Sequence, residues 1–561
     1  MKPSFLIRAG LAAVAVLVSC TKTIDTDSDG FLVDEQPVEG MTFSATLNPQ
    51  TRSRFADDSS PALEWENDEP VMIAALRFNG LTEDMFDGLD DETFTTILNT
   101  LIVTDIGHAD VNAEDKSQAI VKTSKTQAQW LYSPNPDPDD TYLFFAYYPV
   151  TETKPMCSQH SGELWYEFEI PTVQDGRSYW KYQLFFNYIL DVETENFSTY
   201  YTRAEIEGGT EIAFDNFQPV NTLLRFRLKL PDGASGSHTV SKIVLTASGT
   251  DRAIVGKCTS NIVENWLNPA SEGASLSLTL DLDEPVTVTS TVPDDYLFAS
   301  IISQKDNGFS GTFDLTFTAY DENGWPVLRA TKTSPDGGLS AGNRYTFDLT
   351  MEEVAIPDNE IWYTTASGTV IEPFNGRTSY WHGYRSSSYT DATLISNTYD
   401  GIGILRFNEN LVMQDANAFE ANTELTGIKF PDGMKRLDSR GFYGCSNLKN
   451  VILPASLTFL GASIFQNCIS LTSLVIPACN DGSGPTGYPI VQGNAFTGCA
   501  GLETVTFLTE AYPPSLQSPD PFTDTSCLIY VQPSVYETVQ SWNNNGLYWP
   551  VYRDAGRLRS L

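Results

Sequence analysis

Apolar residues recur at fixed intervals over the last third of the chain. Phe419, Phe442, Phe465 and Phe496 are separated by 23, 23 and 31 residues, and further apolar residues follow each of them at constant offsets. The unit reads F-x-x-C-x-x-L-x-x-Φ-x-Φ, where Φ is an apolar residue. Each Φ-x-Φ predicts a short strand with two inward side chains, and such units bury their apolar face only by stacking on neighbours. The pattern therefore predicts a solenoid.

The repeat leucines mark the interior that we expect the stacked units to share. They are Leu425, Leu448, Leu471 and Leu502. An open solenoid end would expose its core, so both ends need caps. We assign an N-terminal cap to residues 359–417, and the leucine-rich repeats with a C-terminal cap to residues 418–554.

The residue between the two Φ positions of each predicted strand should point outward, because side chains alternate along a strand. These residues are Lys429, Ile452, Val475 and Thr506, and their neighbours include Lys449, Asn450, Thr472 and Ser473. Solenoids bind partners on an extended face, so we expect these residues to form a candidate binding surface. The alternative is that Ile452 and Val475 are tolerated as isolated apolar residues on the surface.

One cysteine stands three residues after the repeat phenylalanine in three of the units. The residues are Cys445, Cys468 and Cys499. A cysteine at a constant repeat position is expected to be a small buried thiol. Disulfides between coils or a metal site are the alternatives, although no C-x-x-C or H-x-x-x-H spacing supports a metal.

Short runs with period-two alternation, separated by Gly, Pro, Asn and Asp, fill residues 41–352. This pattern predicts antiparallel β-sandwiches. A fresh strand series after the Gly-Gly pair at 208–209 suggests two of them, at 41–206 and 207–352. We therefore expect a mainly β protein, with two tandem sandwiches followed by the solenoid.

The N-terminus has the features of an export signal. Lys2 and Arg8 precede a ten-residue stretch of apolar and small residues, which is too short to span a membrane, and Cys20 follows it. This arrangement resembles the lipobox of bacterial lipoproteins. The resemblance implies that residues 1–19 are a signal peptide and that Cys20 is acylated, with residues 20–40 as an acidic tether. The run Asp25-x-Asp27-x-Asp29-Gly30 is also similar to half of a calcium loop, but Gln36 replaces the expected Glu.

The repeat unit resembles the BspA-type leucine-rich repeat, most clearly at 442–454 and 465–477. Residues 41–352 resemble the fimbrillin family of pilus subunits, through the sequences at 51–54, 63–69, 217–228 and 341–349. This second resemblance implies two transthyretin-like sandwiches. It also implies assembly by strand exchange with other fimbrillin subunits, after a protease removes an N-terminal strand behind an arginine. Arg52 and Arg54 are the candidates for that cleavage, although both could lie in an ordinary polar loop.

A strand-exchanging shaft subunit would donate its own C-terminal tail, whereas here the repeats follow the second sandwich. We therefore expect a subunit that accepts a strand, which suits the end of a pilus, most readily its tip. The chain also carries a formal net charge of −38 from 34 basic and 72 acidic residues, which disfavours nucleic-acid binding.

The motifs of serine hydrolases, zinc proteases and nucleotide-binding loops do not occur in the sequence. We expect no enzyme activity, no cofactor and no metal. The sequence thus predicts an adhesion lipoprotein of the outer membrane or cell surface, held by lipid at Cys20, whose repeats bind an unknown host or bacterial protein or glycan. One alternative is a surface lipoprotein that binds such a ligand without polymerising, and a remote one is a glycoside hydrolase.

Overall fold

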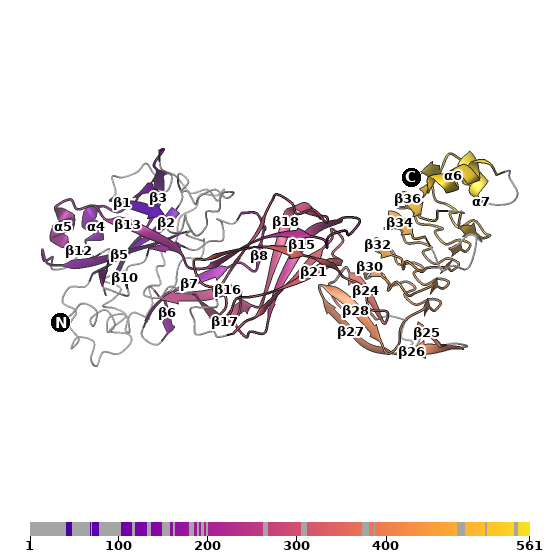
Figure 1. The fold of residues 1–561 in the computed structure, drawn as a ribbon, viewed down its shortest axis with the longest axis horizontal. Coiled ribbons are helices and arrows are strands. Elements are labelled where there is room, and N and C mark those ends of the chain that lie inside the picture. Colours follow the sequence, from indigo (N-terminus) through magenta and orange to yellow (C-terminus); the bar gives the residue numbers. More distant parts are fainter. Residues whose placement is uncertain are drawn as a thin grey trace. The chain divides into compact units, whose positions relative to one another are not determined.

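The computed structural model describes residues 41–561 except the segments 48–67, 69, 78–101, 115–117, 132–135, 149–156, 161–162, 179–184, 188–189, 192–195, 198–199, 262–266, 304–310, 373–380, 386–387, 479–488, 511–512 and 543–547. Its chain forms two compact units (Figure 1). The N-terminal unit comprises Met1–Glu322 and Pro326–Glu353, and the repeat unit comprises Asn323–Trp325 and Val354–Leu561. Each unit is described separately below.

The first sheet of the N-terminal unit has the strand order β12-β5-β2-β3-β4-β1-β13-β9 in the described residues, and β9 also pairs with β5. Its strands are β1 (Thr42–Leu47), β2 (Pro70–Arg77), β3 (Ile102–Val111), β4 (Gln118–Lys122), β5 (Thr141–Tyr148), β9 (Phe185–Asn187), β12 (Tyr200–Thr202) and β13 (Ala213–Pro219). Alternate residues of these strands are buried in one core, as Phe43 and Ala45 of β1 illustrate.

Two short helices accompany this sheet, α4 (Gln127–Trp130) and α5 (Arg203–Glu207). Thr202 and Glu205 form a capping box at the start of α5, in which each side chain satisfies a backbone N–H of the other. Arg203 then reaches the Tyr142 hydroxyl at 3.1 Å and forms ion pairs with Asp140 and Glu207. This polar cluster fastens α5 to the start of β5.

The remaining sheets of the N-terminal unit surround a second core. Their described strand orders are β19-β14-β22, β23-β21-β20-β15-β18-β8 and β17-β16-β7-β6, and β10 and β11 form a separate pair. The bounds are β6 (Cys157–His160), β7 (Glu163–Ile170), β8 (Val173–Gln174), β10 (Leu190–Asp191), β11 (Asn196–Phe197), β14 (Thr222–Lys229), β15 (His238–Ser248), β16 (Val255–Asn261), β17 (Asn268–Ser275), β18 (Ser277–Val288), β19 (Leu297–Ile301), β20 (Asp314–Tyr320), β21 (Pro326–Thr333), β22 (Arg344–Thr350) and β23 (Glu352–Glu353).

The period-two pattern of this region has a direct structural counterpart. In β15, Ile243, Leu245 and Ala247 are buried, whereas the residues between them are not.

Two strand pairings cross the predicted boundary between the sandwiches at residue 206. The strand β13 belongs to the first sheet although it follows residue 206, and β7, which precedes that residue, pairs with β16, which follows it. The limits of the two sandwiches at 41–206 and 207–352 therefore remain a prediction.

The described strands of the repeat unit form three sheets, and most of these strands are parallel. Two of the sheets, β27-β28-β24-β30-β32 and β34-β36-β38-β39, meet where β32 contacts β34 without strand pairing. We call β30, β32, β34, β36, β38 and β39 together the front sheet, which β24, β28 and β27 extend at its N-terminal end. The bounds are β24 (Glu360–Thr365), β27 (Leu394–Asp400), β28 (Ile402–Phe407), β30 (Leu425–Lys429), β32 (Asn450–Ile452), β34 (Ser473–Ile476), β36 (Thr504–Phe507), β38 (Leu528–Val531) and β39 (Leu558–Ser560).

The third sheet, called the rear sheet here, consists mainly of two-residue strands in the order β26-β25-β29-β31-β33-β35-β37. They are β25 (Trp381–Arg385), β26 (Ser388–Ala392), β29 (Met413–Gln414), β31 (Arg436–Leu437), β33 (Phe459–Leu460), β35 (Ile490–Val491) and β37 (Ser515–Leu516). Helices α6 (Pro533–Gln540) and α7 (Tyr548–Asp554) lie at the C-terminal end, and their Val535, Val539 and Tyr552 join the interior of the solenoid.

The predicted fold class is confirmed, because the described chain is mainly β and ends in stacked repeat coils. Among the described residues, no helix is both long and apolar enough to cross a membrane.

Candidate functional site

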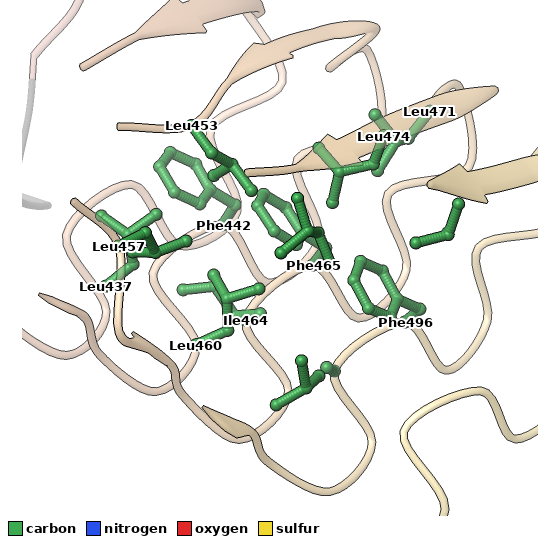
Figure 2. Packing of buried hydrophobic residues seen from close by; sticks show 14 of the residues in the cluster. Leu437, Phe442, Leu453, Leu457, Leu460, Ile464, Phe465, Leu471, Leu474 and Phe496 are labelled. Carbon is green, nitrogen blue, oxygen red and sulfur yellow. The ribbon is translucent and has the colours of Figure 1, made fainter. Parts of the chain in front are cut away.

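A column of phenylalanine rings runs through the interior of the repeat unit. The rings of Phe419, Phe442, Phe465 and Phe496 are stacked with successive centroid distances of 5.4, 5.4 and 5.8 Å and interplanar angles of 11–13°. Figure 2 shows three of these rings among the surrounding leucines. Leu425, Leu448, Leu471 and Leu502 are buried in the same cluster. The single continuous interior that the repeat pattern predicts is therefore confirmed.

The repeat cysteines form a second interior column. The Sγ atoms of Cys445, Cys468 and Cys499 donate hydrogen bonds to the carbonyl oxygens of the repeat phenylalanines one coil earlier, at 3.0, 3.1 and 2.9 Å. All three thiols are free, and burial raises the pKa of Cys445 and of Cys499 to about 12. They are protonated structural thiols, as expected, and each donates to a carbonyl oxygen that also accepts a backbone N–H within its own coil turn.

Each coil turns through backbone conformations that L-residues rarely adopt. Positive φ angles recur two residues before and two residues after the stacked phenylalanine, as at Ser463 (54°) and Asn467 (62°) around Phe465. Glycine takes the second of these positions in two other coils, at Gly444 and Gly498. These turns hold the front and rear sheets on opposite sides of the stacked rings.

The strands of the front sheet present outward side chains at equivalent positions, which we call the outer row. It consists of Lys429, Ile452, Val475, Thr506, Tyr530 and Arg559. Lys429 pairs with Ile452, and Val475, Thr506, Tyr530 and Arg559 pair in succession. Val475 is 50% exposed, whereas Leu474 beside it is 2% exposed. The predicted outward positions thus lie together on one face, although their role in binding stays a prediction.

The predicted neighbours of the outer row precede it by two or three residues along the chain. Lys449, Thr472 and Ser473 are exposed, and Asn450 is half-buried. Asn450 pairs with Gly427 two residues before the outer row, and Ser473 pairs with Thr504 in the same way. A second, polar row therefore runs parallel to the outer row.

Charge is distributed unevenly over this surface. Residues 450–502 contain one charged residue, Asp481, which lies outside the described part of the chain. Residues 359–561 carry 17 acidic and 11 basic residues, a formal charge of −6, while the chain as a whole carries −38. The repeat unit is thus much closer to neutrality than the rest of the protein, and its central coils are almost uncharged.

The ring column continues for one coil beyond the four units found in the sequence. The ring of Phe522 stacks on Phe496 at 4.9 Å and continues the column, and β38 adds Tyr530 to the outer row. Phe522 follows Phe496 by 26 residues, and Leu528-Ile-Tyr-Val531 alternates as a strand should, so the signal was present. The next strand, β39, then brings Arg559 to the end of the row.

The outward residues of the rear sheet form a second surface that the repeat pattern did not reveal. Met413, Arg436, Phe459 and Ile490 pair in succession and are half-buried. The Arg436 guanidinium lies 3.7 Å from the centre of the Phe459 ring and also pairs with Asp438 at 3.2 Å. Arg436 is thus held by neighbours within the unit.

The predicted lipidation site Cys20 and the predicted cleavage sites Arg52 and Arg54 lie outside the described residues. The strand that precedes both arginines in sequence is described. This strand, β1, pairs antiparallel with β4 and parallel with β13. Its Phe43 is fully buried against Trp130, Phe144 and Phe214, with ring centroids 5.4–5.7 Å apart.

Metal-binding chemistry has no visible counterpart in the described residues, which contain no cluster of three or more His, Cys, Asp or Glu side chains suited to a metal ion. Within that part of the chain, the binding residues predicted from the sequence lie on or beside the front sheet.

The fold and this face define a β-rich protein that ends in a leucine-rich-repeat solenoid. Residues 414–511 match the model of the BspA type leucine rich repeat region in six copies, so this part of the chain is a BspA-type repeat region. No curated protein matches the chain.

Several solved structures are similar to parts of the chain. A candidate cell adhesion protein from Bacteroides ovatus is 13% identical, covering 56% of this chain and 95% of its own, with a TM-score of 0.30. A fimbrial protein from Bacteroides vulgatus is 11% identical, covering 56% and 98%, with a TM-score of 0.27. A leucine rich repeat protein from T. pallidum is 14% identical, covering 30% and 94%, with a TM-score of 0.17.

Proposed function

We propose that this protein is a lipid-anchored adhesion protein of the bacterial cell surface, whose repeats bind a host or bacterial protein or glycan. We further propose that it serves as a fimbrillin-like subunit at the end of a pilus, most readily at the tip. The outer face of the front sheet carries the first proposal, and the position of β1 supports the second.

The front sheet has the properties that recognition of a partner requires. Its strands are short and parallel, and they rest on stacked rings, so that the outer row is held on a rigid support. Ile452 and Val475 expose 36% and 50% of their surface at equivalent positions of neighbouring coils. Aliphatic side chains kept in water next to each other, on a nearly uncharged background, favour a contact surface over a solubilising one.

Adhesion is tested by substituting lysine for Val475 in the purified full-length protein. Val551 provides a matched control, because this valine lies on the C-terminal helix α7 with 47% exposure. We expect Val475→Lys to weaken binding to a panel of glycans and matrix proteins at least tenfold, and Val551→Lys to leave it unchanged. Equal effects of the two substitutions would count against the front sheet as the binding surface.

The proposed assembly rests on β1. A cut behind Arg52 or Arg54 would detach β1 from the rest of the chain, because Thr42–Leu47 precedes both arginines. Its loss would expose backbone groups of β4 and β13 and empty the site of Phe43. Unpaired strand edges and a vacated apolar pocket are what an incoming extended segment satisfies in strand addition.

Strand exchange is tested with an arginine-specific protease and mass spectrometry. We expect a cut behind Arg52 or Arg54, which the double variant Arg52→Lys with Arg54→Lys abolishes. The cleaved protein should then take up a synthetic peptide with the sequence of residues 41–48, but not one with Phe43→Asp. A protein that resists cleavage, or that takes up both peptides alike, would instead be a surface binder that does not polymerise.

The lipid anchor is tested separately by growing cells with labelled palmitate. We expect label in the wild-type protein and none in Cys20→Ser, which should also leave the membrane fraction, because several acyl chains give stable anchoring. Retention of Cys20→Ser in the membrane fraction without label would contradict acylation as the means of attachment.

A further inference from the structure

We propose that the outward face of β34, β36, β38 and β39 binds a sugar residue that carries a carboxylate, with Arg559 on the carboxylate and Tyr530 under the sugar ring. This inference rests on the proposed function and names the ligand class of the binding surface. We call the four outward side chains Val475, Thr506, Tyr530 and Arg559 the C-terminal patch.

The C-terminal patch lies within a single sheet. Val475 pairs with Thr506, Thr506 with Tyr530, and Tyr530 with Arg559, all on parallel strands. Each of these residues follows a buried residue along its strand, so alternation directs all four side chains outward. Three strand spacings of about 4.8 Å separate the first side chain from the last, which makes the patch about 14 Å long.

The charge of the patch points to an anionic ligand. Arg559 is the single charged residue of these four strands, in a chain whose acidic residues outnumber its basic ones by 72 to 34. Its exposed side chain donates through Nη1 to the carbonyl oxygens of Gly556 and Leu558 at 2.8 Å. Among the described residues, Arg559 forms no ion pair, and its Nε and Nη2 groups have no hydrogen-bond acceptor.

These contacts leave the guanidinium of Arg559 oriented and charged. Carbonyl groups hold a guanidinium in place without neutralising it. The remaining edge, formed by Nε and Nη2, has the planar fork geometry that holds a carboxylate through two parallel hydrogen bonds. Arg559 can therefore orient a carboxylate as well as attract it.

The residues beside Arg559 match the other parts of a sugar. Tyr530 lies on the neighbouring strand and is half-buried. Sugar rings stack their apolar faces on aromatic side chains, whereas their hydroxyl groups need polar partners. Thr506, which pairs with Tyr530, and Thr504, two residues earlier on the same strand, carry such hydroxyl groups. Val475, at the other end of the patch, offers an apolar contact with 50% exposure.

The position of the patch on the face of the sheet favours a sugar over an extended peptide. A peptide in β-augmentation gains its affinity from main-chain hydrogen bonds to an open strand edge. The strand β36 pairs with β34 and β38, and β38 pairs with β36 and β39, so the backbone of both central strands is occupied on both sides. The patch offers side chains alone, which suits a ligand that is recognised through its ring, hydroxyl groups and carboxylate.

The size of the patch favours a small ligand over a folded partner. A strip about 14 Å long and roughly 7 Å wide has an area of about 100 Å². A standard protein interface buries about 800 Å² on each partner. A second copy of this chain could not form a stable dimer through so small a strip.

The experiment measures the binding of soluble glycans to the purified full-length protein by calorimetry. The probes are sialyllactose and an oligosaccharide that ends in glucuronic acid, each also as its methyl ester. We expect at least one of the two acids to bind, and its ester to bind about tenfold or more weakly, because the ester keeps the sugar and removes the charge. The acid that binds identifies the source of the carboxylate.

Variants then test the role of each side chain. Arg559→Gln should weaken binding of the acid about tenfold or more, and Arg559→Lys by less, because lysine keeps the charge without the planar fork. Tyr530→Ala should weaken binding of acid and ester alike, since stacking does not depend on the carboxylate. The control Arg329→Gln, at an exposed arginine of β21 in the N-terminal unit, should change nothing. Thermal unfolding checks that each variant keeps its fold.

Equal affinity for acid and ester, or undiminished binding by Arg559→Gln, would overturn the proposal. Failure of both acids to bind would also overturn it, and the adhesion assay then shows whether the proposed function survives. If Val475→Lys still weakens adhesion to the panel, this inference fails alone, whereas a wild-type protein that adheres to nothing in the panel would remove both. Capture of an acidic peptide in place of the sugars, lost in Arg559→Gln, would assign the patch to a protein partner instead.

Discussion

The ring column makes a quantitative prediction about how neighbouring coils depend on each other. Phe465 is fully buried, and its ring stacks on Phe442 at 5.4 Å and on Phe496 at 5.8 Å. Replacement by leucine keeps most of the buried apolar volume but removes both ring pairs. An aromatic pair contributes about 0.5–1.5 kcal/mol beyond the area that it buries, so the two pairs contribute about 1–3 kcal/mol. We expect Phe465→Leu to destabilise the repeat unit by that amount.

Leucine is preferred to alanine because Phe→Ala in a core costs about 3–5 kcal/mol, which is a large share of the stability of a typical domain. The assay is native-state hydrogen exchange of the full-length protein in increasing urea, read by mass spectrometry on peptides from residues 437–507. These peptides report the free energy of opening of the central coils without interference from the N-terminal unit.

Double-mutant cycles then test whether the coupling is between nearest neighbours. Because Phe465 stacks on both Phe442 and Phe496, each of these pairs should show a coupling of about 0.5–1.5 kcal/mol. The pair Phe442 and Phe496, which Phe465 separates, should show a coupling near zero, as one-dimensional stacking requires. Equal coupling in all three pairs would mean that a substitution in one coil affects all coils alike. Contacts between neighbouring rings would then not determine the stability of the repeat unit.

Three further changes probe the coil turns and the thiol column. Ser463→Gly should stabilise the central coils by about 1 kcal/mol in the same exchange assay, because Ser463 has a φ of 54°; a loss of stability would show that its side chain matters more than its backbone. Gly461→Ala should destabilise them by about 1–3 kcal/mol in urea unfolding, since the new Cβ would lie 2.3 Å from the backbone nitrogen of Ser439; no loss would mean that the coils can shift apart. Burial raises the pKa of Cys468 well above its usual value, so its stabilising effect is complete below the unfolded pKa of about 8.5 and declines as the pH rises towards the folded value. The urea midpoint should therefore fall between pH 8 and pH 10.5, less steeply in Cys468→Ala, and equal slopes would refute the assignment.

The inward and outward faces of the solenoid could be derived from the sequence because they depend on local periodicity. Leu474 and Val475 occupy constant offsets from Phe465, and alternation along a strand sends the first inward and the second outward wherever the coil lies. The buried thiols follow from the same argument, since a constant offset places each cysteine against the coil before it.

The extent of the solenoid could not be derived in this way. Val505 pairs with Ile529, although Ile529 stands seven residues after Phe522 and Val505 stands nine after Phe496. The fifth coil thus shortens one turn by two residues while ring stacking and strand register are both kept. A search for a constant period fails there, because stacking fixes where the ring and strand lie in space and leaves the length of the turn free.

The sequence by itself determined which side chains each coil buries, because regularly spaced apolar side chains are removed from water together only when the coils stack. Only the tertiary structure decided which further outward residues become neighbours, beyond those between the two apolar positions of each repeat strand. The rear-sheet row of Met413, Arg436 and Phe459, and the pair of Tyr530 and Arg559, join residues that stand 23 or 29 positions apart on neighbouring strands. Outward residues experience no common apolar force that would impose a pattern on them, so their arrangement is a consequence of how the interior stacks.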